Sequence, residues 1–299
     1  MRFADHSTGK PYAKDPAVVF FGDTYWLYYS LPPHPEVGRN GWAIGVARSQ
    51  DMEEWAKVGE ILPEQRCERN GLCAPGAVVL DGRVHLFYQT YGNGARDAIC
   101  HAASEDGLRF VRDPTNPVFA PTGDWNNGRA IDADVLPDGD RLLLYFATRD
   151  PSGRVQKLGV ASAPLPSDFG RDQWTQLGHE SILEPALPWE QDCIEAPAVC
   201  RRDGRFYLFY AGAYNNAPQQ IGCAVSDDGL AWERPSDRPF LPNGEPGAWN
   251  SSESGHPFVF THTSGETTLF FQGNDDGGRT WHLSKVGIGW RDGRPFVQP

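Results

Sequence analysis

The stretch DPAVVFFGDTYWLYYS, residues 15–30, decides the fold, because its pattern returns four more times along the 299-residue chain. In every copy an apolar run leads into a turn, and the turn leads into an aromatic run. An aromatic residue anchors each copy, and the anchors follow one another at steps of 59, 58, 64 and 61 residues. A period this long, built from strands, predicts an all-β protein, a five-bladed β-propeller. The other copies are APGAVVLDGRVHLFYQ (74–89), DADVLPDGDRLLLYFA (132–147), EAPAVCRRDGRFYLFYA (195–211) and HPFVFTHTSGETTLFFQ (256–272), and the anchors are Tyr29, Tyr88, Phe146, Tyr210 and Phe271.

Each repeat offers about four strands. Short Gly- and Asp-containing turns, such as GD at 22–23 and DG at 81–82, separate the first strand from the second and suit tight hairpins. A later turn phrase, SEDGLRF (104–110) or SDDGLAW (226–232), ends in an aromatic residue that opens the fourth strand. The repeats fill nearly all of residues 1–299, so we expect a single domain. The N-terminal stretch 1–14 is short and polar, and we do not expect it to complete the last blade.

The charge balance excludes several classes of partner. The formal net charge is −12 and the sequence pI is about 5.1, whereas nucleic acid or an anionic membrane would require a basic face. No apolar run approaches the length of a membrane span. The first ten residues, MRFADHSTGK, lack the apolar core of a signal peptide, so we expect a cytoplasmic protein or a secreted one whose signal has been removed. The oligomeric state stays open.

Six cysteines permit disulfides, but a domain of this size does not require them. Cys67 and Cys73 lie in one loop, RCERNGLC, and could pair in an oxidising compartment. Cys100 and Cys223 occupy the same strand position in different repeats, so we interpret them as small buried apolar residues. No spacing among the cysteines resembles a zinc site.

The first residue of each copy is the position that points to function. Asp15, Ala74 and Asp132 lie fourteen residues before their anchor aromatics. Glu195 and His256 lie fifteen before theirs, which we attribute to turns that are longer by one residue. On this interpretation all five hold one structural slot at the start of the innermost strand, where equivalent positions of a ring face a common axis. Three carboxylic acids from three repeats should therefore meet.

A cluster of carboxyl groups in a pocket has a chemical consequence. Like charges raise the pKa of one member, which keeps its proton, while another member stays ionised. One residue class then supplies both an acid and a base. Cleavage of a glycosidic bond needs this pair, a proton donor for the leaving oxygen and a carboxylate on the other face of the sugar.

These residues resemble glycoside hydrolase family 43, through KDP at 14–16, AID at 130–132 and IEAP at 194–197 within a five-fold repeat that covers nearly the whole chain. The resemblance implies an inverting glycosidase on a five-bladed propeller. It implies that Asp15 is the general base that activates water and that Glu195 is the general acid. It implies that Asp132 orients the acid, tunes its pKa and touches the sugar. The base and acid carboxyl groups of an inverting enzyme stand about 6.5–9.5 Å apart to admit a water.

Five further residues are candidates for binding the sugar: Asp134, Trp125, Asn126, Arg279 and His256. Members of the family usually carry Pro after the middle Asp, whereas this chain has Ala133; Asp134 then follows as a second pocket acid or a salt-bridge residue deeper in the channel. Trp125 and Asn126 precede Asp132 on a loop that should approach the pocket, where indole packs on a sugar face and amides bond hydroxyls; the alternative is a buried loop anchor. Arg279 would grip a hydroxyl or carboxylate, or it is a solvated loop cation.

His256 would lie in the central channel. In similar propellers a histidine near this position binds water or a calcium ion, and the alternative is a neutral, hydrogen-bonded histidine. We predict no required cofactor and no metal ligand set, with a channel calcium ion near His256 left open.

The substrate predicted from these features is an oligosaccharide or polysaccharide, from which terminal pentose or furanose residues are removed, as by an α-L-arabinofuranosidase or a β-xylosidase. Two alternatives stay open. One is a retaining β-fructofuranosidase-like or phosphorylase-like propeller, although the opening Lys14-Asp15-Pro16-Ala17 differs from the Asn-Asp-Pro-Asn of the former and no basic cluster for phosphate stands out. The other is a non-catalytic carbohydrate-binding propeller, whose signature would be the loss of one carboxyl group.

Overall fold

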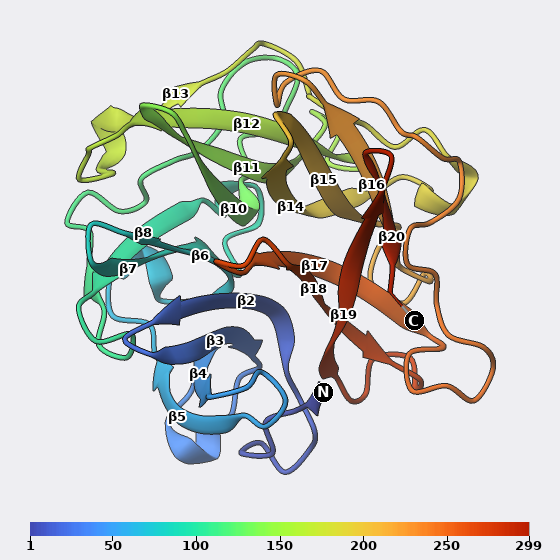
Figure 1. Ribbon diagram of the computed structural model, residues 1–299. Helices are drawn as coiled ribbons and strands as arrows, with labels where there is room; N and C mark the ends of the chain where they lie inside the picture. Colours follow the sequence, from blue (N-terminus) through green and yellow to red (C-terminus); the bar gives the residue numbers. More distant parts are fainter. Residues whose placement is uncertain (299) are drawn as a thin grey trace.

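The computed structural model describes residues 1–298, and within them five antiparallel sheets surround one axis, which confirms the five-bladed β-propeller (Figure 1). The innermost strands of neighbouring sheets contact one another all the way round, and the last contacts the first. The first three blades have the predicted four strands each. They are β2 (Lys14–Phe21), β3 (Thr24–Leu31), β4 (Ala43–Ser49) and β5 (Ala56–Ile61); β6 (Leu72–Leu80), β7 (Arg83–Thr90), β8 (Ile99–Ser104) and β9 (Val111–Arg112); and β10 (Ile131–Asp138), β11 (Arg141–Arg149), β12 (Gln156–Pro164) and β13 (Thr175–Gln176).

The fourth blade is shorter than predicted. A single bridge between Val225 and Glu233 stands where a fourth strand would pair with its neighbour. The blade's three strands are β14 (Ile194–Arg202), β15 (Arg205–Gly212) and β16 (Gln220–Ser226).

The N-terminal stretch completes the fifth blade, so the expectation that it would not is wrong. In β1 (Arg2–Phe3), Arg2 pairs with Ser284 and Phe3 with Leu283. Two residues suffice because β19 is ten residues long: its first part is free for β1, while its last part pairs with β20. The remaining strands of this blade are β17 (Glu253–Thr261), β18 (Thr267–Asn274), β19 (His282–Arg291) and β20 (Arg294–Val297).

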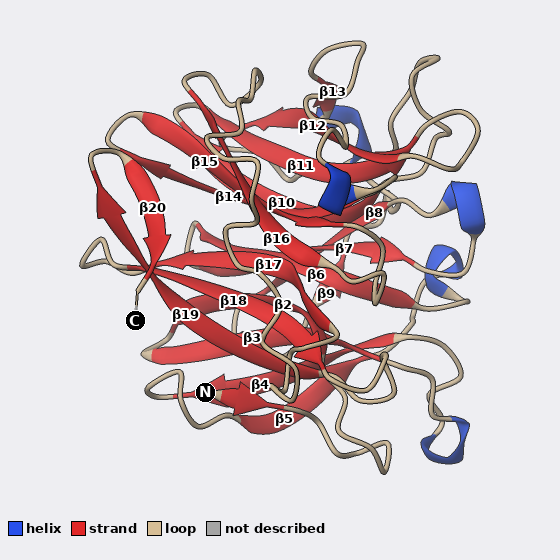
Figure 2. Ribbon diagram, turned by 90° about the vertical axis from the view of Figure 1, so that its right-hand side faces the viewer, coloured by secondary structure: helices blue, strands red, loops and turns tan. Residues whose placement is uncertain are grey.

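Helical structure in residues 1–298 is limited to five 3-10 turns, which all lie in one half of the molecule in Figure 2. None of the described helices combines the length and apolarity needed to cross a membrane. The turns are η1 (Pro35–Val37), η2 (Arg66–Glu68), η3 (Gly94–Arg96), η4 (Arg171–Gln173) and η5 (Pro188–Glu190).

Aromatic residues of the second strands hold the blades together. The five anchor aromatics are buried. The tyrosine just before the anchor in blade 1, Tyr28, donates its hydroxyl hydrogen to the carbonyl of Gly107 in blade 2 at 2.8 Å. The buried hydroxyl group of the tyrosine is thereby hydrogen-bonded, while its ring fills the space between the sheets. The same bond joins later blades, from Tyr145 to Gly229 (3.1 Å) and from Tyr207 to Gly293 (2.7 Å).

All six cysteines are free thiols. The pairing considered for Cys67 and Cys73 is therefore not present in this structure. Cys100 and Cys223 are buried, as the interpretation of them as small apolar residues requires.

Candidate active site

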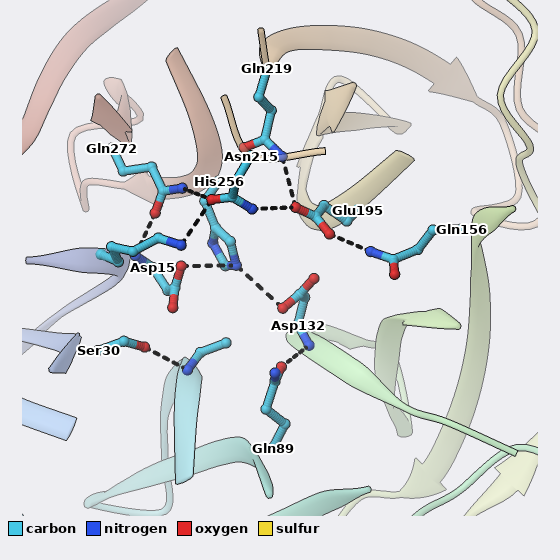
Figure 3. A network of polar contacts seen from close by, with 12 residues as sticks. Asp15, Ser30, Gln89, Asp132, Gln156, Glu195, Asn215, Gln219, His256 and Gln272 are labelled. Atoms are coloured by element: carbon cyan, nitrogen blue, oxygen red, sulfur yellow. Dashed lines mark hydrogen bonds and ion pairs between the residues drawn. The ribbon is translucent and has the colours of Figure 1, made fainter. Parts of the chain in front are cut away.

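The predicted acids meet at one end of the propeller axis. Asp15 belongs to the inner strand of blade 1, Asp132 to that of blade 3, Glu195 to that of blade 4 and His256 to that of blade 5 (Figure 3). All four side chains line one cavity of about 200 Å³. Each is less than a tenth exposed. Residues up to 241 positions apart in sequence thus share one small cavity.

An unusual backbone conformation aims three of these side chains. Asp15, Asp132 and His256 have φ values of 52°, 54° and 45°, in the left-handed region that residues with a Cβ rarely adopt. Such strain persists only where neighbours impose it. The amide oxygen of Gln272 accepts the backbone N–H of Asp15 at 3.1 Å, and that of Gln89 accepts the N–H of Asp132 at 2.6 Å. Each glutamine belongs to the preceding blade of the ring, so contact between blades positions the acids.

The prediction that Glu195 shares this slot is wrong. Glu195 pairs with Ala211 in the same register in which Ile131 pairs with Ala147, one residue before the slot. The slot itself holds Ala196, whose φ is 51°. The turn of blade 4 has two residues between paired Arg202 and Arg205, so it is not longer than the others.

For His256 the explanation by turn length is confirmed. The first two strands of blade 5 end at paired Thr261 and Thr267, which leaves five residues in the turn. That turn is three residues longer than the turn of blade 1, and the paired strands are one pair shorter, so the hairpin gains the one residue that brings His256 to the slot of Asp15 and Asp132.

His256 lies between two carboxylates. Its Nε2 is 3.4 Å from Oδ1 of Asp15 and 3.3 Å from Oδ1 of Asp132 (Figure 3). Burial opposes a charge on the ring, but the nearby Asp15, Asp132 and Glu195 outweigh it and raise the pKa of His256 to about 9. At neutral pH the residue is therefore an imidazolium, not the neutral histidine of the sequence-based alternative.

Glu195 has the environment of an acid that keeps its proton. Burial raises the pKa of its carboxyl group above the ordinary range, and the charge of Asp132 raises it further. Its Oε1 accepts N–H groups from Gln219 at 2.7 Å and Asn215 at 3.1 Å, and its Oε2 accepts one from Gln156. A buried carboxyl group with a raised pKa, facing a cavity shared with two other acids, is suited to general acid catalysis.

Comparison with known proteins decides the family. The family model described as glycosyl hydrolases family 43 matches residues 9–295. The chain belongs to glycosyl hydrolase family 43. A β-xylosidase of Xylanibacter ruminicola is 28% identical over 181 residues, which are 58% of this chain and 48% of that protein. The chain thus spans about half the length of that curated relative.

Solved structures support the fold assigned to this family 43 chain. A thermostable family-43 glycoside hydrolase superposes with a TM-score of 0.76 at 21% identity, covering 96% of this chain and 93% of the other. An endo-1,4-β-xylanase of Bacteroides thetaiotaomicron superposes with a TM-score of 0.76 at 20% identity, covering 98% and 96%. Identities this low speak for the propeller alone.

The wall of the family 43 cavity holds basic and aromatic side chains that sequence reasoning missed. Lys14 donates to Oδ1 of Asn215 at 2.8 Å and lies 4.3 Å from the centre of the Trp281 ring. Its place directly before Asp15 is a signal that could have been followed. The others come from strand ends and loops whose approach to the axis no local pattern announces. They are Tyr91, Arg129, Arg149 and Tyr214, together with the amides Gln156 and Asn215; Trp42 also lines the cavity.

Trp125 and Asn126 do not line the cavity. The Trp125 ring packs with a hydrophobic cluster shared by blades 2 and 3, and its Nε1 is buried. The Asn126 amide donates to the carbonyl of Thr122 and accepts from the N–H of Gly128, both at 2.8 Å. The structure thus gives both residues the geometry of the alternative, a loop anchor.

Arg279 and Asp134 also lie outside the cavity. Arg279 is exposed and donates to the carbonyl of Asp276 at 3.1 Å. Asp134 is buried deeper along the axis, where it accepts the N–H of Val199 at 2.7 Å. Burial raises the pKa of Asp134 to about 7. It is neither a second acid of this cavity nor a salt-bridge residue, because its partner is a backbone amide.

The calcium ion considered near His256 stays a prediction. Among residues 1–298 no group of three or more His, Cys, Asp or Glu side chains is arranged to hold a metal ion. Calcium prefers six to eight oxygen ligands. The carboxylates of Asp15 and Asp132 beside Nε2 of His256 supply fewer oxygens than that, so these side chains by themselves do not fit the ion.

Proposed function

We propose that this protein is a glycoside hydrolase that removes terminal pentose or furanose residues from an oligosaccharide or polysaccharide, as an α-L-arabinofuranosidase or β-xylosidase does. One observation carries the proposal. Glu195, whose pKa is raised by burial and by Asp132, faces the same cavity as the ion-paired Asp15. The pocket therefore holds a proton donor together with a carboxylate, the pair that glycosidic cleavage needs.

The proposed reaction is a single displacement. A water attacks the anomeric carbon and gives a proton to Asp15, while Glu195 gives its proton to the glycosidic oxygen as the carbon–oxygen bond breaks. The products are a free sugar with inverted anomeric configuration and a hydroxyl on the leaving group. Asp132 supports the acid, because its charge raises the pKa of Glu195. The positive His256 holds the carboxylates of Asp15 and Asp132 in place from the floor of the site.

The size of the cavity favours a terminal sugar. At about 200 Å³ it is smaller than the 300–1,000 Å³ typical of pockets for drug-sized ligands, so it suits one small ring instead of several. Trp42, Tyr91 and Tyr214 supply aromatic surfaces for the apolar face of a ring. The name of one relative, a β-xylosidase, also supports a pentose.

Phosphorolysis is the alternative that the structure makes worth testing. Lys14, Arg129 and Arg149 line the cavity, although the sequence had offered no basic cluster. All three cations nevertheless have protein partners, since Lys14 donates to Asn215, and both arginines donate to the amide oxygen of Gln156. We therefore favour water over phosphate as the nucleophile.

A panel of nitrophenyl glycosides tests the proposal, led by α-L-arabinofuranoside, β-xyloside and β-galactofuranoside, each with and without inorganic phosphate. We expect release of nitrophenol and free sugar from at least one pentoside or furanoside, at a rate that phosphate does not change. If the product is a sugar 1-phosphate, the reaction is phosphorolysis and not hydrolysis. If the protein binds these sugars but turns over no glycoside, it is a non-catalytic carbohydrate-binding propeller and not an enzyme.

A further inference from the structure

Three amide side chains surround the carboxyl group of Glu195, and each comes from a different place in the fold (Figure 3). Gln156 begins β12, Gln219 precedes β16, and Asn215 lies in the loop between β15 and β16. An amide can turn either its oxygen or its nitrogen toward a neighbour, and the choice decides whether that neighbour meets a donor or an acceptor. The second partner of each amide fixes the choice here.

Gln156 is oriented by arginines. Its Oε1 accepts N–H groups from Nε of Arg149 at 3.0 Å and from Nη1 of Arg129 at 3.5 Å. A guanidinium has only donors and stays charged. Turning the amide over would set its N–H groups against these donors and its oxygen against Glu195. Gln156 therefore must present Nε2 to Oε2 of Glu195.

Asn215 and Gln219 are fixed by the same logic. Oδ1 of Asn215 accepts from the ammonium group of Lys14 at 2.8 Å, and an ammonium group can only donate. Nε2 of Gln219 donates to the carbonyl of Ala213 at 2.9 Å, and a carbonyl can only accept. Both amides consequently direct N–H groups at Oε1 of Glu195, at 3.1 and 2.7 Å.

The count of lone pairs then locates the acidic proton. A carboxyl oxygen offers two lone-pair sites. Oε1 of Glu195 spends both on Asn215 and Gln219, whereas Oε2 spends one on Gln156. We infer that Gln156, Asn215 and Gln219 are positioning residues, which leave Oε2 as the oxygen that carries the acidic proton and offer that proton no acceptor within their shell.

This arrangement serves both halves of the acid's cycle, and it rests on the proposed function. Before the reaction, a proton that no amide can accept is available to the glycosidic oxygen. After the transfer, three N–H groups stabilise the new carboxylate. Removing a donor should therefore raise the pKa of Glu195. The titratable groups that face this carboxyl group are Lys14, Asp132, Cys193, Tyr214, Glu253 and His256.

The test replaces the donor by an acceptor of the same shape. In Gln156→Glu the new carboxylate keeps the arginines and faces Oε2 of Glu195 with an oxygen, which would take the proton. We expect kcat on an alkyl pentoside, whose leaving group needs protonation, to fall about 100-fold, and kcat on a dinitrophenyl pentoside to fall less than about 10-fold. The basic limb of the pH profile should move to higher pH, because a donor has been lost and a negative charge added.

Two further variants keep the test decisive. Gln156→Leu removes the donor without adding an acceptor or a charge, and it should shift the basic limb in the same direction even if Gln156→Glu does not fold. The matched control is Gln176→Glu, because Gln176 is a half-buried glutamine on β13 that does not line the cavity and whose amide donates to loop carbonyls, and its profile should overlay that of the wild type.

The outcomes separate the inference from the proposed function. The inference alone would be overturned if the wild type cleaves the glycosides but the Gln156→Glu variant loses equal activity on both leaving groups. It would also be overturned if that variant keeps the basic limb of the wild-type pH profile. A wild type that cleaves none of the glycosides would overturn the proposed function. If the loss of kcat in Gln156→Glu depends on the leaving group and the basic limb of the pH profile moves to higher pH, the result supports both the inference and the proposed function.

Discussion

The two ends of the propeller axis are lined by the same five inner strands but have opposite character. At one end Asp15, Asp132, Glu195 and His256 share a cavity of about 200 Å³. At the other, a larger cavity of about 550 Å³ is lined mainly by apolar side chains of the same strands, such as Val79. The polar end lies where the inner strands begin with a left-handed residue. The position of a residue along its inner strand thus decides whether its side chain faces the polar cavity or the apolar one.

Asp132 and Asp134 show this difference within one strand. Oδ1 of Asp132 lies 3.3 Å from the positive ring of His256 and faces the small cavity. Asp134, two residues later, bonds the N–H of Val199 and reaches only the apolar end. Both carboxyl groups are buried. Burial of an acid is therefore no sign of catalysis unless charged partners and a shared cavity accompany it.

Glu195→Gln should have the largest effect. The substitution keeps the shape of the side chain and removes the acidic proton, so we expect kcat to fall by about 10³-fold or more for an alkyl pentoside, with binding of the sugar retained. Steady-state kinetics and calorimetric titration measure the two quantities. Activity within about tenfold of the wild type would assign the proton to another group.

His256→Gln should come second. It removes the cation between Asp15 and Asp132, and we expect kcat/KM to fall by about 10- to 100-fold. The folded-state pKa of about 9 lies above the ordinary 6.5, so the stability that the charge provides is complete below about pH 6.5 and is lost as the pH rises through 9. Urea unfolding at several pH values should show the advantage of wild type over variant shrinking across this window. An advantage that does not change with pH would refute the imidazolium.

Asp134→Asn should leave catalysis nearly intact and act on stability. We expect kcat/KM to stay within about threefold of the wild type, because Asp134 does not line the small cavity. The pKa of Asp134 is raised from 3.8 to about 7 in the folded state, so its ionisation costs the wild type stability as the pH rises from about 4 to 7. Thermal unfolding of both proteins should therefore shift in favour of the variant over that range. A catalytic loss comparable to that of Glu195→Gln would erase the distinction between the two ends.

Arg279→Ala should have the smallest effect. The side chain is exposed and bonds only its own turn, at the carbonyl of Asp276. We expect kcat/KM within about twofold of the wild type and an unchanged melting temperature. A rise in KM for the sugar would instead bring this loop into the binding site.

The fold could be predicted because its signal is repeated. Five copies of a strand–turn–strand phrase impose five blades whatever each copy does locally. The closure of the ring could not be predicted in the same way, since β1 pairs over only Arg2 and Phe3. A strand this short has no periodicity of its own, and the length of β19 makes its pairing possible.

The acids of the site could be predicted because they begin inner strands, but their surroundings could not. Fourteen residues before the anchor Tyr210 stands Ala196, which takes the left-handed position, so the error lay in assuming a longer turn that would move Glu195 into the slot. Gln156 and Asn215 belong to another strand and a loop and meet Glu195 only in three dimensions, as does Arg149 with Gln156. Trp125 was expected at the pocket for its chemistry, yet its ring packs against the hydrophobic cluster of blades 2 and 3.

In the proposed mechanism, carboxyl groups from different blades act together on one sugar, Asp15 on the attacking water and Glu195 on the leaving oxygen. Proton NMR of the first-formed sugar, recorded before the anomers equilibrate, tests it most directly. We predict that the wild type releases the anomer opposite to that of the substrate. Release of the same anomer would mean a covalent intermediate on a carboxylate and would contradict the roles assigned here.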